Sequence, residues 1–515
     1  MKFLTNKSKA LFLVLSILST PFAFAQEKGL DERINDAFTP IANWWESLIL
    51  HNFPGTEIPT IIFLLVGGAL FFTIYFGFIN IKRFPTAINT VRGKYDAVED
   101  SSDDGEVSHF QALATAVSGT VGNGNIAGVA LAIALGGPGA TFWMVICGLL
   151  GMSSKFVECT LGVQYRDVGE DGTIYGGPMY YISKGLKERG FTNLGKVAAV
   201  FFAIFCIGGS FGGGNAAQSN QATIVLKDLM SLESTAAGFW IGIILAFLVG
   251  IIIIGGIKRI AQVTEKVVPF MAVMYIIACL YIILSNFSLI DDAFSLIVSE
   301  AFNPKAIGVG GVIGVLLVGF KRAAFSNEAG AGSASIAHSA VKTKYSASEG
   351  LVALLEPFID TVVICTMTAL VIIIFNFGGA FQYGGEGDVM IDGISYEGAG
   401  ITSMAFGEYI PYSNIFLTIA VVLFAVSTMI SWSYYGLQSW KYLFGRGKVA
   451  DLTYKLLFLV FVIIGASASM NSIWAFSDAM IFAMVFPNMI GLFFLFPVVK
   501  KELKKYINAI KTLEG

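Results

Sequence analysis

Between residues 115 and 128 the chain interleaves glycines with amide and hydroxyl side chains inside an apolar stretch. The residues concerned are Ser118, Gly119, Thr120, Gly122, Asn123, Gly124, Asn125 and Gly128. Non-helical backbone at membrane depth is tolerated only inside protein or beside a cavity. Such backbone exposes carbonyl oxygens that suit a hard cation and N–H groups that suit a carboxylate. Close helix packing would explain the glycines but not the two asparagines, so we interpret the stretch as a binding site.

A second glycine-rich stretch lies in an apolar segment, residues 306–338, that is too long for one straight membrane crossing. We expect its break near residues 310–314, in the outer half. The inner half would then carry Lys321, Arg322 and Glu328 to the cytoplasmic surface.

The composition is that of a membrane protein. Of the 515 residues, 55% are hydrophobic and 13% are charged, and the mean hydropathy is +0.72. A soluble chain of this length would lack the polar residues to cover its surface. The hydrophobic composition therefore excludes a soluble enzyme. The net charge of −3 shows no excess of basic residues, which excludes a nucleic-acid partner.

The N-terminus has the pattern of a cleavable signal peptide, residues 1–25. Three lysines precede an apolar segment too short to span a bilayer, and Ala23-Phe24-Ala25 follows as a small-x-small cleavage pattern. An uncleaved anchor is the alternative. Residues 26–56, which include Trp44 and Trp45, are expected to form a periplasmic or interfacial amphipathic segment.

Hydropathy predicts about eleven membrane spans. They are residues 57–81, 109–135, 139–163, 197–218, 236–256, 265–286, 306–338, 350–376, 414–436, 452–469 and 474–499. With the mature N-terminus outside, the loops predicted inside carry 23 Lys and Arg, and the segments predicted outside carry four. This bias supports a multi-pass protein of the inner membrane with a cytoplasmic C-terminus.

The two interrupted spans, the second and the seventh, are five helices apart. That spacing indicates two inverted five-helix repeats with a site at their interface. Residues 57–108 would be an accessory helix and a cytoplasmic loop, and residues 109–286 and 306–499 the repeats. The second repeat includes an acidic extracytoplasmic loop, residues 377–413, expected to be a structured cap, and a basic cytoplasmic tail, residues 500–515, follows it.

Enzymatic chemistry has no support in the sequence. No Walker-type nucleotide motif occurs, and the three histidines lie at predicted span ends rather than in a cluster. The five cysteines lie in apolar segments without a metal-ligand spacing. We therefore expect a protein that is not an enzyme and has neither a cofactor nor a bound metal beyond an alkali cation.

Two intramembrane carboxylates, Glu356 and Asp360, lie one turn apart in the eighth span. Carboxylates at this depth indicate a functional site. We expect them to pair with Lys321 and Arg322 as a lock on an inner gate. A proton-binding site is the alternative.

Four motifs together resemble the alanine or glycine:cation symporter family over about residues 55–500. They are Thr120 to Ala130, Gly176 to Tyr181, Ser326 to His338, and Glu356 to Asp360 with the following residues to Leu370. The resemblance implies a LeuT-type fold, all-α with two broken helices. It also implies a symporter that couples inward sodium flux to uptake of small neutral amino acids such as alanine and glycine.

The resemblance also implies site residues. Substrate would contact Thr120, Gly122, Asn123, Gly124, Asn125, Gln218, Gly314, Thr428 and Trp432, and the cation would contact Ser118, Val121, Ser427 and Thr428. Trp432, one turn from Thr428, would leave room only for a small side chain. The alternatives are an interfacial position for Trp432 and hydrogen bonds from the two hydroxyls to their own helix.

Other functions remain open at this point. A proton-coupled symporter and a passive pore are the alternatives, and a membrane enzyme would need a catalytic cluster.

Overall fold

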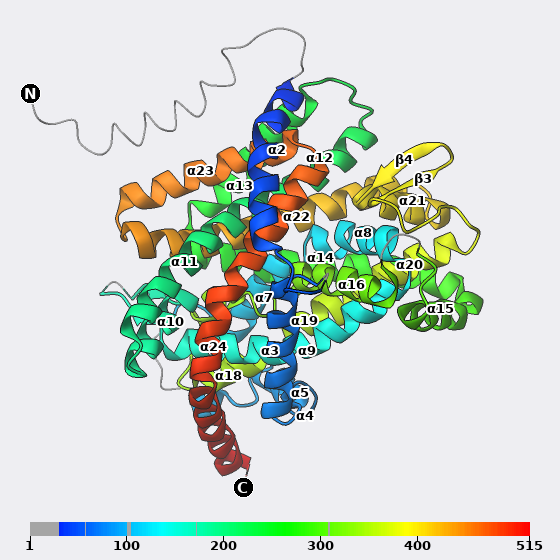
Figure 1. The fold of residues 1–515 in the computed structure, drawn as a ribbon. Helices are drawn as coiled ribbons and strands as arrows, with labels where there is room; N and C mark the ends of the chain where they lie inside the picture. Colours follow the sequence, from blue (N-terminus) through cyan, green and yellow to red (C-terminus); the bar gives the residue numbers. More distant parts are fainter. Residues whose placement is uncertain (1–29, 57, 100–104, 171, 307–309, 515) are drawn as a thin grey trace, which may run out of the picture.

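The computed structural model describes residues 30–56, 58–99, 105–170, 172–306 and 310–514, and it is a helical protein with two small β-hairpins (Figure 1). The predicted signal peptide lies outside the described residues. One hairpin pairs β1 (Asp167–Val168) with β2 (Ile174–Tyr175), and the other pairs β3 (Asp388–Ile391) with β4 (Ile394–Glu397).

The helices of the first half run from α2 to α15. They are α2 (Leu30–Ile49), α3 (Thr60–Tyr75), α4 (Ile79–Lys82), α5 (Phe84–Val91), α6 (Asp96–Glu99), α7 (His109–Thr120), η2 (Asn123–Asn125), α8 (Ala127–Gly136), α9 (Gly139–Gln164), α10 (Pro178–Glu188), α11 (Thr192–Phe211), η3 (Gly212–Ala216), α12 (Ala217–Leu229), α13 (Ala237–Ile253), α14 (Gly256–Ser285), η4 (Phe287–Leu289) and α15 (Ile290–Phe302).

The helices of the second half run from α16 to α24. They are α16 (Gly311–Asn327), α17 (Ala334–His338), α18 (Ser346–Val352), α19 (Leu355–Pro357), η5 (Phe358–Cys365), α20 (Thr366–Asn376), α21 (Ala399–Tyr409), α22 (Ser413–Phe444), α23 (Lys448–Ser467) and α24 (Met470–Glu514).

Seven of the described helical segments are long and apolar enough to cross a membrane. Helix α7 and the segment Asn123–Gly136 together form a further candidate span, bent by 56° at its break, and α3 and α13 are shorter apolar helices. The chain is therefore a multi-pass membrane protein, and the count of eleven spans stays a prediction.

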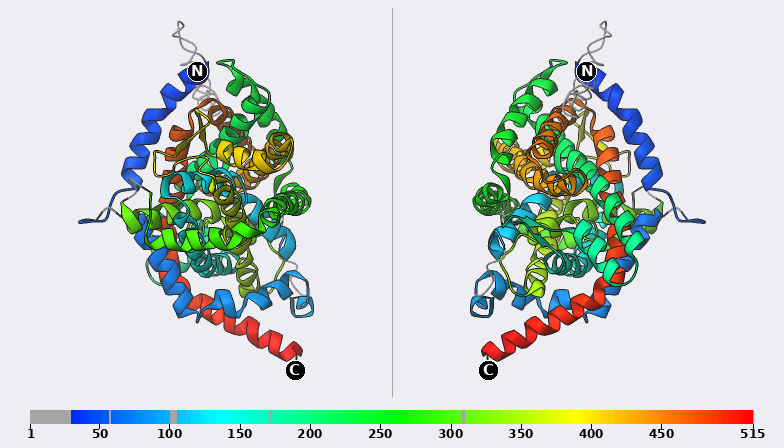
Figure 2. Two further views of the ribbon diagram at one scale, coloured as in Figure 1. Left: turned by 90° about the vertical axis from the view of Figure 1, so that its right-hand side faces the viewer. Right: turned by 90° about the vertical axis from the view of Figure 1, so that its left-hand side faces the viewer.

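Segments predicted to share one side of the membrane contact one another. On the predicted inner side, Lys94 pairs with Glu514 at 2.9 Å and Asp167 with Arg446 at 3.2 Å. On the predicted outer side, Asp31 pairs with Lys227 at 3.0 Å. Figures 1 and 2 place the start of α2 and the end of α24 at opposite ends of the molecule.

The predicted break at residues 310–314 does not interrupt a helix: the positive φ angles at Gly310 (78°) and Gly311 (69°) lie at the start of α16. Helix α16 begins at Gly311 and runs without interruption to Asn327, and the chain leaves the helix at residues 328–333. Backbone φ angles are positive at Glu328 (54°), Gly330 (92°) and Gly332 (90°). Within α16, Gly319 permits close packing, since a Cβ there would lie 2.6 Å from the Ala140 carbonyl oxygen.

The acidic segment 377–413 is folded. Asp392 and Gly393, with φ of 52° and 80°, form the turn of the β3–β4 hairpin, which needs positive φ at both positions. Helix α21 follows and is held by Thr402, whose hydroxyl donates to the Ile126 carbonyl at 3.2 Å. The segment thus packs directly against the interrupted second span.

A chain of alternating buried acids and bases crosses the predicted inner half of the protein. His109 contacts Glu349 and also Glu99 at 3.0 Å, and His338 contacts Glu349 at 2.5 Å. The expectation that the histidines are not clustered is therefore wrong for two of the three, because His109 and His338, distant in the sequence, share the Glu349 carboxylate.

The chain of charges ends at a buried ion pair between α9 and α19. Lys155 Nζ lies 2.9 Å from Glu356 Oε1, and both side chains have no solvent exposure. His338 lies 3.6 Å from the second oxygen of Glu356. Removing one partner of such a pair leaves a buried charge without compensation.

We predict that Lys155→Met destabilises the protein by about 3–5 kcal/mol, because Glu356 loses its cation. The measurement is the thermal midpoint of the purified protein in detergent. Lys155→Met combined with Glu356→Leu should recover part of the loss, since the carboxylate that lay 2.9 Å from the lysine is then removed together with it. Lys501→Met, an exposed position on α24, is the matched control. An unchanged midpoint in the single variant would contradict the assignment.

Candidate functional site

The second span is broken at residues 121–126. The break is tolerated because side chains accept hydrogen bonds from backbone N–H groups that have lost their helical partners. Helix α7 ends at Thr120, and Gly122 is extended with φ −139° and ψ −153°. The Gly122 N–H donates to Asn125 Oδ1 at 2.9 Å, and the Asn123 N–H donates to Gln218 Oε1 at 2.9 Å. The two asparagines and Gln218 of α12 thus meet at this break.

Asp360 lies at the same break, held by neutral donors. The Asn125 amide donates to Asp360 Oδ1 at 2.7 Å, and the hydroxyls of Ser326 and Thr361 donate to Oδ2 at 2.9 Å and 2.7 Å. Its carboxylate is fully buried in the π-helical segment η5. Among the described residues, no cationic side chain pairs with it.

The residues predicted to bind the cation lie where α7 meets α22. Thr428 Oγ1 donates to the Ser118 carbonyl at 3.0 Å, and Ser118 Oγ donates to the Ser427 carbonyl at 2.8 Å. Ser427 Oγ instead donates to the Phe424 carbonyl at 2.9 Å. For Ser427, the alternative that its hydroxyl bonds its own helix is therefore the one observed. Val121 is buried at the end of α7.

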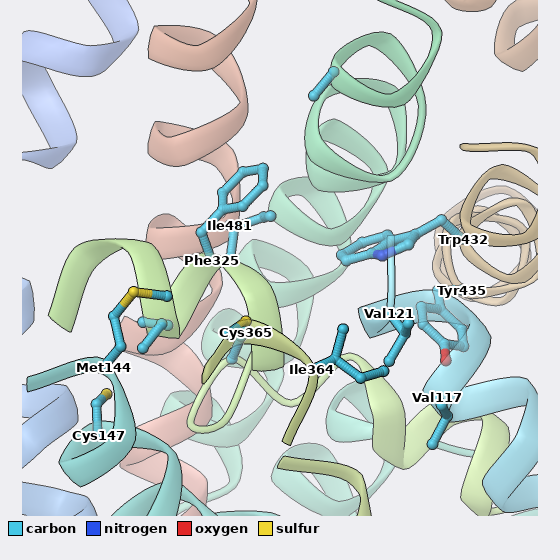
Figure 3. Packing of buried hydrophobic residues seen from close by; sticks show 14 of the residues in the cluster. Val117, Val121, Met144, Cys147, Phe325, Ile364, Cys365, Trp432, Tyr435 and Ile481 are labelled. Atoms are coloured by element: carbon cyan, nitrogen blue, oxygen red, sulfur yellow. The ribbon is translucent and has the colours of Figure 1, made fainter. Parts of the chain in front are cut away.

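Trp432 is buried beside the break. Only 1% of its surface is exposed, so an interfacial position is wrong. Its indole N–H donates to Glu328 Oε1 at 2.9 Å, and a Cβ at Gly214 would overlap its ring. In Figure 3, Trp432 and Tyr435 lie on the side of Val117 and Val121 within the apolar packing.

The two glycines of the break differ in the space around them. A Cβ at Gly122 would overlap the Thr428 hydroxyl and lie 3.0 Å from Gln218 Oε1. A Cβ at Gly124 would lie 3.4 Å from Ser326, which is an ordinary van der Waals contact. Gly122 is therefore required by close approach, whereas Gly124 is less constrained. Thr120 donates within its own helix, to the Ala116 carbonyl at 3.3 Å.

Gly314 does not lie at this site. Ser326 is the residue of α16 that faces Gly124 and Asp360, and Gly314 lies twelve residues earlier in the same continuous helix. Twelve residues correspond to about 18 Å along a helix axis. Ser326 was missed as a site residue, although it begins the Ser326 to His338 motif.

The predicted lock between Lys321 and Arg322 and the carboxylates Glu356 and Asp360 is also wrong. Arg322 forms an ion pair with Asp478 of α24, and Lys321 lies 3.0 Å from Asp478 and 3.7 Å from Glu46. Glu46 and the neighbouring hairpin belong to segments predicted outside. The two bases therefore contact segments that are predicted to lie on the outer side, and not the predicted inner gate.

Several polar atoms around the break have unused bonding capacity. Asn123 Oδ1, Ser431 Oγ and Tyr435 Oη are buried, and each has no hydrogen-bond partner among the described residues. A Cβ at Gly119 would lie 2.9 Å from Tyr435 Oη, which places this hydroxyl against α7. Buried polar atoms without partners are rare, and they mark places where a ligand or water belongs. Neutral oxygens predominate here, and these suit a hard monovalent cation or an ammonium group.

Comparison with known proteins gives a consistent result. A sequence model of the sodium:alanine symporter family matches residues 44–514. The sodium/alanine symporter AgcS of Methanococcus maripaludis is 40% identical over 458 residues, which cover 89% of this chain and 96% of that protein. The putative sodium/proton-dependent alanine carrier protein YrbD of Bacillus subtilis is 35% identical over 455 residues, covering 87% and 89%.

The fold also has a solved relative. The crystal structure of MhsT in complex with L-phenylalanine aligns with a TM-score of 0.50 at 15% identity, covering 78% of this chain and 99% of that chain. This likeness shows a LeuT-like fold. With a family match over most of its length, this chain belongs to the sodium:alanine symporter family and is a cation-coupled amino-acid transporter.

Proposed function

We propose that this protein couples inward sodium flux to the uptake of small neutral amino acids, alanine and glycine, by alternating access in the inner membrane. The observation that carries the proposal is the fully buried break at residues 121–126, where Asn123 Oδ1 has no partner among the described residues. The proposal places the mature N-terminus outside and the C-terminus in the cytoplasm, with two five-helix repeats related by inversion.

In this proposal the substrate binds through backbone at the break. Its carboxylate is dehydrated at mid-membrane, so it needs donors already in place. N–H groups at the start of α8 supply them, aided by the positive end of the helix dipole. The ammonium group would then take Asn123 Oδ1 as acceptor. Gly122 must stay small because backbone and ligand approach closely there.

The cation would lie one turn away, between α7 and α22. The carbonyl oxygens of Ser118 and Val121 and the Thr428 hydroxyl offer oxygen ligands without a fixed charge. Thr428 already donates its proton to the Ser118 carbonyl at 3.0 Å, so its lone pairs are free to face a cation.

Proton coupling is a second candidate, and Asp360 is the observation that favours it. A buried carboxylate that receives hydrogen bonds from Asn125, Ser326 and Thr361, with no cationic partner among the described residues, can exchange a proton during transport. The relative YrbD is named as sodium/proton-dependent. The two candidates differ in which gradient drives uptake.

The test uses purified protein in liposomes with radiolabelled alanine. We predict accumulation against the alanine gradient when sodium is imposed outside at equal pH. Thr428→Ala should raise the sodium concentration needed for half-maximal uptake by about tenfold, as expected for one lost ligand or charge-assisted hydrogen bond. Ser427→Ala is the matched control, because its hydroxyl bonds its own helix, and it should change little.

Two results would count against sodium coupling. Uptake driven by a pH gradient in sodium-free buffer, and lost in Asp360→Asn, would favour the proton. Equilibration without accumulation under either gradient would indicate a passive pore.

Substrate size is predicted to depend on Trp432. Discrimination by an apolar pocket amounts to about 1–3 kcal/mol per methylene, so exclusion of larger substrates needs a bulky, fixed wall. Trp432→Ala should weaken alanine uptake and admit neutral amino acids of the size of leucine. Competition by a panel of unlabelled amino acids measures this. Trp240→Ala, at a position 62% exposed, is the control. An unchanged substrate profile in Trp432→Ala would place the wall elsewhere.

The two glycines of the break provide a paired test of the binding site. Gly122→Ala should abolish sodium-dependent alanine binding at the break of the folded, purified protein, because the new Cβ overlaps the Thr428 hydroxyl. Gly124→Ala should retain binding within about tenfold, since its Cβ meets Ser326 at 3.4 Å, an ordinary contact. If both variants bind as wild type, the second span is a packing helix and the site lies elsewhere.

A further inference from the structure

Glu328 directly follows helix α16, and its backbone has a positive φ of 54°. This left-handed conformation is unfavourable for a residue with a Cβ, which is why glycine usually occupies such positions after a helix. Glycine does occupy the two later positive-φ positions of the same turn, Gly330 and Gly332. A glutamate at the first of these positions indicates that its side chain has a role that glycine could not fill.

Both carboxylate oxygens of Glu328 accept hydrogen bonds from neutral groups. The residue is 3% exposed. Its Oε1 accepts from the indole N–H of Trp432 at 2.9 Å, and its Oε2 accepts from the Ser333 hydroxyl. Ser333 ends the same turn, so the carboxylate joins this turn to α22. Among the described residues, no cationic side chain forms an ion pair with it, and its position therefore depends on these two donors.

The turn that carries Glu328 is fixed against α24. The Asn488 amide donates to the Gly330 carbonyl at 2.8 Å. A Cβ at Gly330 would lie 2.8 Å from Met489, and a Cβ at Gly332 would lie 2.9 Å from Asn488. This close contact leaves the backbone of the turn little freedom, so the two carboxylate oxygens are held in one place.

The Trp432 indole has one polar atom, and Glu328 provides its hydrogen bond. The ring lies against two glycines, because a Cβ at Gly214 would overlap it and a Cβ at Gly209 would lie 3.3 Å from its edge. The Tyr435 ring packs against it at a centroid distance of 5.3 Å. Apolar contacts of this kind limit the space for the ring, whereas the hydrogen bond fixes the direction in which the indole N–H points.

We propose that Glu328 is a positioning residue that sets the size limit for the substrate, because its carboxylate holds the Trp432 indole in the orientation that closes the pocket to larger side chains. A wall excludes larger substrates only if its rotamer is locked by its surroundings. The proposal rests on the proposed function, in which Trp432 is that wall. Ser326, two residues before Glu328, faces Gly124 and Asp360, so the end of α16 contacts both the break and the wall.

Two other roles would use the charge of Glu328 instead. The carboxylate would bind the ammonium group of the substrate, or it would carry a proton. Both roles need an ionisable carboxyl group, whereas positioning needs only an acceptor oxygen next to the indole. Glu328→Gln keeps an acceptor without the charge, and Glu328→Met keeps only the length of the side chain. Because both replacements are unbranched, the cost of the positive φ is similar in the two variants.

The experiment uses the full chain in liposomes with an imposed sodium gradient. It measures the concentrations of unlabelled leucine and of unlabelled alanine that halve the uptake of labelled alanine, and takes the ratio of leucine to alanine. Glu328→Gln should keep this ratio within about threefold of wild type, since the indole retains an acceptor. Glu328→Met should lower the ratio about tenfold, as expected for one lost hydrogen bond to a buried carboxylate.

Trp432→Phe tests the same hydrogen bond from the side of α22. It keeps an aromatic ring but removes the N–H, and it should lower the ratio by a factor similar to that of Glu328→Met. In the Trp432→Phe background, Glu328→Met should cause no further loss, because the bond is already absent. Thermal midpoints in detergent identify variants that fail to fold, and Trp432→Phe keeps the test valid if Glu328→Met is one of them.

Glu300→Met is the matched control. Glu300 of α15 is also a buried glutamate, 1% exposed, and it also accepts from a neutral donor, the Tyr383 hydroxyl at 2.6 Å. Loss of that bond should lower the thermal midpoint and leave the ratio of leucine to alanine unchanged. The control separates a role in substrate size from a role in stability alone.

The outcomes distinguish this proposal from the proposed function. A wild-type ratio in folded Glu328→Met, or fully additive losses in the double variant, would overturn the positioning role and leave the symporter intact. Equal loss of alanine uptake in Glu328→Gln and Glu328→Met would show that the charge is needed, and would also overturn it. Absence of sodium-driven alanine uptake in wild type would instead remove the proposed function, and the positioning role with it.

Discussion

The structure depends on one constraint: a chain that leaves the helix inside a membrane must satisfy its backbone hydrogen bonds by other means. At residues 121–126 the replacement partners are amide side chains, with Asn125 accepting from Gly122 and Gln218 accepting from Asn123. Those two side chains come from the break itself and from α12, so the break and its neighbours hold each other in place. Asn125 extends the network to Asp360 at 2.7 Å, which connects the break to η5.

This constraint explains why the first break was predictable from the sequence. Glycines alone do not distinguish a packing helix from an unwound one, but asparagines next to them do, because they supply the bonds that the backbone loses. In the seventh span the same reasoning failed. Gly319 of α16 permits close approach to α9, whereas the helix ends at Glu328, a residue type that gives no sign of positive φ.

Partners distant in the sequence could not be predicted. Lys321 and Arg322 were assigned to the wrong carboxylates because Asp478 lies 156 residues away from Arg322, in a span whose depth hydropathy does not fix. Glu349 was missed as the link between His109 and His338 for the same reason. The β3–β4 hairpin, by contrast, had a local signal in Asp392-Gly393, a dipeptide that favours the tight turn between two strands.

The buried pair of Lys155 and Glu356 has a consequence for how the protein is made. Each charge belongs to a different span, and the two spans are separated by about 200 residues of chain. A charge inside the membrane opposes insertion, by up to about 2.5–3.5 kcal/mol at the centre of a span. Because α9 is synthesised before α19, Lys155 enters the bilayer before Glu356 is available. During synthesis, α9 is therefore a weakly inserted helix that becomes secure only when α19 arrives. Assembly of the two halves would then be ordered in time, with the first half awaiting the second.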